Sequence, residues 1–114
     1  EISECLVGSE MCKETGFIAA HSIPNLFYIL RKSLDSNSLR LFLLGLCNLL
    51  TVVCIDETMM ISGLQNISFS DFEDCLQSEC AEKAGAKYII TRNTKDFVYS
   101  SIPAITPNDF FNQL

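Results

Sequence analysis

The stretch "SDFEDCLQSECAEKAGAKYIITRNTKDF", residues 70–97, predicts the fold because it contains a complete helix–strand unit. A capping box predicts the start of the helix, with Ser70 as N-cap and Glu73 at the third helical position. Gly85 supplies a left-handed stop, and the apolar run Lys87–Thr91 then reads as a buried strand. A polar turn or a single helical turn over residues 93–97 ends the unit.

Outward from this unit, helical segments alternate with short apolar strands. We expect helices over residues 3–15, 22–32, 39–48, 57–66, 70–84 and 107–114, and strands over 17–20, 51–55, 87–91 and 103–106. Ser22, Asp56 and Thr106 are placed to cap the helices that follow them. This order predicts one α/β domain over residues 1–114, with three layers and a central parallel sheet flanked by helices.

Composition narrows the class of protein. Hydrophobic residues make up 48% and charged residues 19% of the chain, which predicts a packed core. The apolar run at 41–50 is too short for a membrane span of about 20 residues, and no signal peptide is visible, so we expect no membrane association. A net charge of −6 argues against binding nucleic acid by phosphate neutralisation alone, but it does not exclude a nuclease.

The six cysteines favour a reducing compartment. None forms a Cys-x-x-Cys pair, and most lie inside apolar segments. Cys47, Cys54, Cys75 and Cys80 therefore read as small core residues, and we expect a cytoplasmic protein. With one histidine and no cluster of ligands, a zinc site is not expected.

Oxygen-bearing side chains gather at one predicted edge of the sheet. Asp71 and Asp74 lie in the first turn of the helix at 70–84, and Asn93 and Asp96 follow the strand that ends at Thr91. Carboxylates and amides suit Mg²⁺ or Mn²⁺, which can activate a bound water and stabilise charge on a phosphoryl group. Helix capping and the macrodipole, at about 0.3–1 kcal/mol each, are a sufficient alternative explanation for Asp71 and Glu73.

At these residues the chain resembles the PIN domain family. The matching stretches are 71–77, 90–97, 105–110 and 19–28. The resemblance implies a magnesium-dependent endoribonuclease acting on RNA, and many relatives are toxins of bacterial toxin–antitoxin pairs, which implies an antitoxin partner. By position, Asp74 would be the acid at the helix start, Asn93 would occupy the metal site, Asp96 would be the adjacent acid, and Thr91 would support the turn.

Two departures from the family pattern leave alternatives open. The family's first strand, with its metal-binding aspartate, would precede Glu1, so the chain reads as N-terminally truncated, with a groove open beside the strand at 17–20. A second chain, in a homodimer or by domain swapping, is one way to complete such a sheet. Asn25 stands where the family often has a glutamate. The competing hypotheses are a metal-dependent ribonuclease and a catalytically silent PIN scaffold or interaction module, with a response-regulator-like domain as a weaker third.

Overall fold

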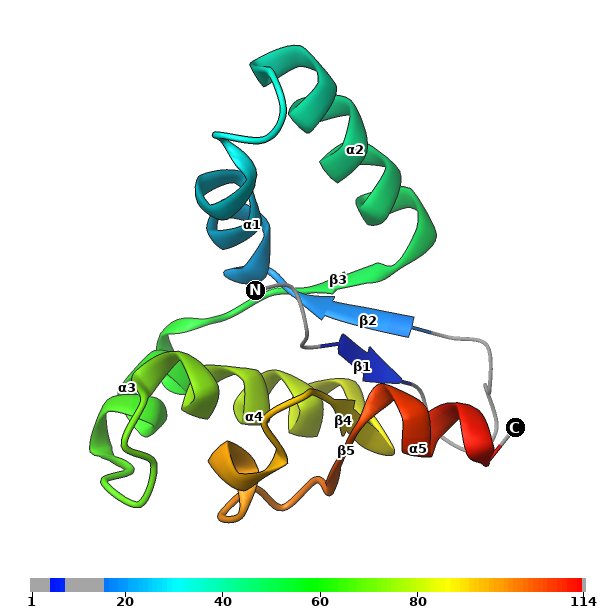
Figure 1. Ribbon diagram of the computed structural model, residues 1–114. Helices are drawn as coiled ribbons and strands as arrows, with labels where there is room; N and C mark the ends of the chain where they lie inside the picture. The colour runs from blue at the N-terminus through cyan, green and yellow to red at the C-terminus, as the bar shows by residue number, and fades with distance from the viewer. Residues whose placement is uncertain (1–4, 8–15, 114) are drawn as a thin grey trace.

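The computed structural model describes residues 5–7 and 16–113, and Figure 1 shows how its elements are arranged. Helices lie on both faces of a twisted sheet. In chain order the elements are β1 (Cys5–Val7), β2 (Gly16–Ala19), α1 (Ser22–Leu30), α2 (Ser36–Leu49), β3 (Thr51–Val53), α3 (Glu57–Gln65), α4 (Phe72–Ala84), β4 (Tyr88–Ile90), the 3₁₀ turn η1 (Thr94–Phe97), β5 (Ala104–Ile105) and α5 (Pro107–Asn112).

The strands form one sheet in the order β3-β2-β1-β4-β5. The pairs β2–β3 and β4–β5 are parallel, whereas β1 is antiparallel to both β2 and β4. Consequently β2, β3, β4 and β5 all run in the same direction, and their carboxyl ends meet at one edge of the sheet. The predicted α/β class is confirmed, with one reversed strand at the centre of the sheet.

The central strand corrects two expectations. Residues 5–7 are a strand, so the predicted helix over 3–15 is wrong there, and the rest of that prediction lies outside the described residues. Leu6 pairs with Phe17 of β2 on one side and with Ile89 of β4 on the other. This strand occupies the place beside β2 where a groove was expected. Its backbone N–H and C=O groups pair with those of β2 and β4, so no open groove remains there.

Two apolar clusters lie on opposite faces of the sheet. Ile18 belongs to a cluster with residues of α1 and α2, and its neighbour Ala19 belongs to a cluster with residues of α3, α4 and η1. Successive residues of a strand point to opposite faces, so β2 separates the two clusters. This arrangement gives the predicted three layers. Among the described helices, none is both long and apolar enough to cross a membrane.

Side chains set most of the helix starts. Asp56 accepts the backbone N–H of Met59 at 2.8 Å, and Thr106 accepts that of Asp109 at 3.1 Å, so both predicted caps are confirmed. The Ser22 cap is wrong: Ser22 is the first residue of α1, and His21 before it is the N-cap and makes no capping side-chain hydrogen bond. Helical backbone already begins at His21, which moves the start of the helix by one residue.

Gly85 ends α4 in the left-handed conformation, with φ of 68°, as predicted. A Cβ added there would have no heavy atom within 4 Å, so the need for glycine is conformational and not steric. We expect Gly85→Ala to lower the free energy of unfolding by about 1 kcal/mol, as measured by urea denaturation. Gly85→Asn should lose less, because Asn tolerates this conformation, and equal losses would contradict the explanation.

The four cysteines predicted to be core residues divide into two classes. Cys75 and Cys80 are buried as predicted, but Cys47 and Cys54 are exposed, so that prediction is wrong for half of the set. Cys47 lies on the outer face of α2, and Cys54 follows the edge strand β3. Burial raises the pKa of Cys80 to about 11, and burial with the charges of two nearby glutamates raises the pKa of Cys75.

This division predicts the order of alkylation. Because the thiolate is the reactive form, iodoacetamide at neutral pH should modify Cys47 and Cys54 before it modifies Cys75 and Cys80. Cys75 and Cys80 should react only when the protein is unfolded. Peptide mass spectrometry before and after adding denaturant measures each site, and rapid labelling of Cys80 in the native protein would contradict its burial.

Candidate functional site

The first turn of α4 carries two of the predicted acids. Asp71 is the N-cap, and its Oδ1 accepts the backbone N–H groups of Glu73 at 2.8 Å and of Asp74 at 3.3 Å. The predicted Ser70 cap is therefore wrong, because one carboxylate oxygen one residue later satisfies two of the helix's free amides. This shift makes Asp74, and not Glu73, the third helical residue. Asp71 has a capping role that explains its position, and Asp74 is half-buried.

Contacts one turn further along α4 locate the face on which Asp74 lies. Gln77 donates from Nε2 to Ser22 Oγ at 2.7 Å, and the hydroxyls of Ser78 and Ser100 are 2.7 Å apart. Residues three and four positions apart share a helix face, so Asp74 shares its face with Gln77 and Ser78. That face is held between the segment after β2 and the segment after η1.

These contacts were not predicted from the sequence. Gln77 and Ser78 are both 6% exposed. Neither belongs to the apolar stripe that helical spacing predicts to be buried, which consists of Phe72, Leu76, Cys80 and Ala84. Within that stripe Leu76 and Cys80 are buried as expected, whereas Phe72 is 37% exposed. The sequence does contain a signal of these contacts, namely two polar residues in mid-helix beside an apolar stripe. Buried polar side chains need hydrogen-bond partners, so such residues predict contacts with other segments.

The segment after β4 is fixed by Thr91. This side chain is fully buried, and its hydroxyl accepts the backbone N–H of Asn93 at 3.1 Å, which confirms the predicted support of the turn. Asn93 is the N-cap of η1, but its side chain makes no capping hydrogen bond. The Asp96 N–H donates to the Asn93 carbonyl at 3.0 Å, and both side chains are exposed. Their oxygens are thus presented at the edge where β4 ends.

We expect Thr91→Val, which keeps the shape of the side chain, to lower the free energy of unfolding by about 1 kcal/mol because the Asn93 amide loses its acceptor. Hydrogen exchange at that amide should also become faster. Urea denaturation and amide exchange measure the two effects. Thr58→Val at an exposed position of α3 is the matched control. Unchanged exchange at Asn93 would show that the hydroxyl does not hold the turn.

The oxygen atoms of the candidate site can be compared with the ligands that a divalent metal ion prefers. Asp74, Asn93 and Asp96 offer the hard oxygen atoms that Mg²⁺ and Mn²⁺ prefer. Among residues 5–7 and 16–113, however, no three His, Cys, Asp or Glu side chains are grouped so as to hold a metal ion. Magnesium is commonly bound through one or two carboxylates and keeps several waters. Two acids and an amide are therefore the types of ligand that a magnesium ion takes.

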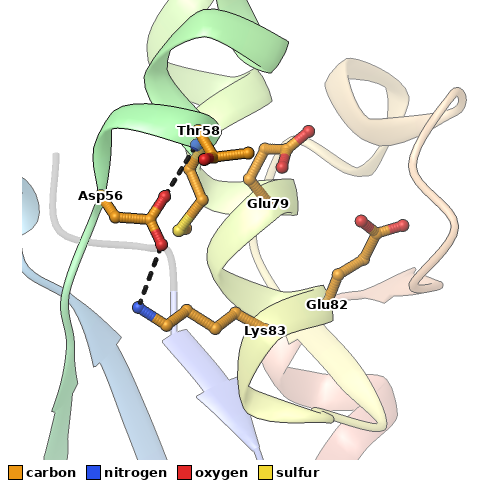
Figure 2. Close-up of a pocket in the computed structure, with 6 residues that line it drawn as sticks. Asp56, Thr58, Glu79, Glu82 and Lys83 are labelled. Carbon is orange, nitrogen blue, oxygen red and sulfur yellow. Dashed lines mark hydrogen bonds and ion pairs between the residues drawn. The ribbon is translucent and has the colours of Figure 1, made fainter.

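A second acidic region lies between α3 and α4, and Figure 2 shows its side chains. This cavity of about 330 Å³ is lined by Asp56, Thr58, Met59, Glu79, Glu82 and Lys83. Asp56 caps α3 and lies 3.9 Å from Lys83, and Glu79 and Glu82 each accept a serine hydroxyl. Each acid has a partner within the fold, so the cluster fixes α3 against α4.

Comparison with known proteins gave one match, to a family model. Searches of curated proteins and of solved structures gave no significant match. A family model described as PIN domain matches residues 6–95, which is well over half of the chain. PIN domains have a nuclease-type fold, generally use divalent metal ions and in general bind RNA. The chain belongs to the PIN domain family.

Proposed function

We propose that the protein is a metal-dependent endoribonuclease. Its principal acid is Asp74, Asn93 and Asp96 complete or orient the site, and Asp71 holds the first turn of α4 beside them. The observation that carries the proposal is the position of the Asp74 face. Hydrogen bonds of the next helical turn fasten that face to the segments after β2 and η1.

The proposed chemistry uses Mg²⁺ or Mn²⁺ as cofactor. Such an ion, held by Asp74 with Asn93 and Asp96, would lower the pKa of a bound water and stabilise charge on the phosphoryl group. The chain's own residues supply the negative charge and the fixed geometry. Thr91 contributes rigidity, because its hydrogen bond fixes the turn that carries Asn93.

Cleavage of single-stranded RNA by the full-length protein tests this function. We expect cleavage in the presence of Mg²⁺ or Mn²⁺ and none in excess EDTA, since the chemistry depends on the metal. Restoring the metal should restore cleavage, which excludes irreversible unfolding by the chelator. Cleavage that continues unchanged in EDTA would contradict metal dependence.

The proposal extends to a biological role. We propose that the protein is a cytoplasmic toxin of a bacterial toxin–antitoxin pair, built from a single domain and able to form a homodimer. This role is supported by family membership, since many PIN domains are toxins of such pairs. Induced expression in a bacterial host should then arrest growth, and co-expression of the antitoxin should relieve the arrest. Normal growth at high expression would contradict a toxin role.

A catalytically silent PIN scaffold is the second candidate, and two observations favour it. The described residues contain no group of three or more His, Cys, Asp or Glu placed around a metal. Asn25, in the first turn of α1, is neutral and half-buried where a glutamate would add a charge. Calorimetry with Mn²⁺ separates the candidates, because a silent scaffold should show no tight binding and a nuclease should bind the ion through its acids.

A further inference from the structure

A polar cavity lies beside the candidate site. It has a volume of about 390 Å³ and is lined by Arg92, Thr106, Pro107 and Asn108. The backbone explains why these residues meet: β4 and β5 are parallel neighbours, and the Thr91 N–H donates to the Ile105 carbonyl at 2.9 Å. Arg92 and Thr106 therefore follow the two strands at the same edge, and Arg92 directly precedes Asn93.

The lining of this cavity is that of an anion site. Arg92 brings a guanidinium group, whose forked donors match two phosphate oxygens, and Asn108 brings an amide. The Thr106 hydroxyl accepts the Asp109 N–H at 3.1 Å, so its own proton remains able to donate. No lining residue carries a carboxylate. An anion placed here would meet the hydrogen-bond donors of three side chains.

Two other described cavities differ in kind. The cavity in Figure 2 is lined by Asp56, Glu79 and Glu82 against one lysine, so its net charge repels anions. The cavity between α1 and α2 is mostly apolar, and its two arginines lie over aromatic rings. The cavity at Arg92 combines a guanidinium with polar donors next to the candidate site.

We propose that Arg92, with Thr106 and Asn108, binds a phosphate of the RNA strand and so positions that strand against Asp74 and Asn93. This inference rests on the proposed ribonuclease function. Arg92 is a positioning residue, since it would hold the sugar–phosphate backbone of the RNA beside the phosphate that reacts. A phosphate contact holds the strand without reading its sequence, so the effect of Arg92 should be similar for all sequences.

Binding measured without turnover tests the inference. Fluorescence anisotropy in EDTA, with a short fluorescein-labelled single-stranded RNA, measures the dissociation constant at several salt concentrations. We expect Arg92→Gln to weaken binding about tenfold and to reduce the slope of log K against log salt by about 1. Arg92→Lys should recover only part of the loss, because lysine keeps the charge but not the fork.

The matched control is Lys32→Gln, which removes the same charge from an exposed position just beyond the far end of α1. It should leave affinity and salt slope within about twofold of the parent protein, because an isolated surface cation makes no fixed phosphate contact. Equal weakening by both variants, or none by Arg92→Gln, would overturn the inference. Inorganic phosphate should displace the RNA from this site only when it is in large excess, and a dissociation constant for inorganic phosphate below that for the RNA would assign the cavity to free phosphate and overturn the inference.

Kinetics with metal separate this inference from the function on which it rests. In an active enzyme Arg92→Gln should raise KM more than it lowers kcat, as expected for a group that holds substrate and transition state alike. If the parent protein binds RNA through Arg92 but never cleaves it, the nuclease proposal fails and the phosphate site stands. If cleavage occurs and Arg92→Gln leaves both the dissociation constant and KM unchanged, the phosphate site fails and the nuclease stands.

Discussion

Replacing Asp74 by Asn should abolish RNA cleavage, with kcat falling by at least about a hundredfold. Metal ions supply several kcal/mol of charge stabilisation in such reactions, and each 1.4 kcal/mol lost lowers the rate about tenfold. The substitution keeps size and polarity and removes only the charge. Single-turnover cleavage of a labelled RNA in Mg²⁺ measures the effect, and calorimetry with Mn²⁺ shows whether the ion is lost together with activity.

Glu73→Gln is the matched control for this variant. It removes the same charge from the neighbouring residue of the same helical turn, but Glu73 is exposed, whereas Asp74 is half-buried and lies about 100° further round the helix. The control should keep activity within about threefold of the parent, as surface changes away from a site usually do. Full activity in Asp74→Asn would contradict the proposed site. Equal losses in both variants would mean that the helix dipole, and not a bound metal, sets the rate.

The helix–strand unit at residues 70–97 was predictable because its signals are local. Gly85 marks the end of α4 through its backbone freedom. The support of the turn by Thr91, which the family resemblance implies, is a hydrogen bond to the amide only two residues later. The start of α4 was missed by one residue, because Ser70 and Asp71 are adjacent N-cap residues and sequence alone does not rank them. The shift matters for function, since it gives Asp71 a structural explanation and moves Asp74 to the third helical residue.

Long-range features could not be predicted in the same way. Leu6 pairs with Phe17 on one side and Ile89 on the other. Which strand lies at the centre of the sheet depends on all the strands together, and a short apolar run does not show whether a strand is parallel or antiparallel to its neighbours. The bond between Gln77 and Ser22 joins residues 55 positions apart. Spacing along a helix predicts which residues share a face, but it does not predict what that face contacts.

The largest expected effect on stability is at Ile89, which is fully buried in β4 and belongs to the cluster under α4. Ile89→Ala should lower the free energy of unfolding by about 2–5 kcal/mol, from lost burial and the cavity left behind. For a domain whose total stability is about 5–15 kcal/mol, this loss is a large fraction. Urea denaturation followed by circular dichroism measures it.

Ile67→Ala is the control for the same chemical change, because Ile67 is 94% exposed and its loss should alter stability by less than about 0.5 kcal/mol. A loss at Ile89 no larger than at Ile67 would contradict the packing of β4 against α4. The comparison also bears on the site, since β4 leads directly to Thr91 and the Asn93 turn, while α4 carries Asp74. If Ile89 joins these two elements, its truncation should lower the temperature at which RNA cleavage is lost, without changing the metal requirement below that temperature.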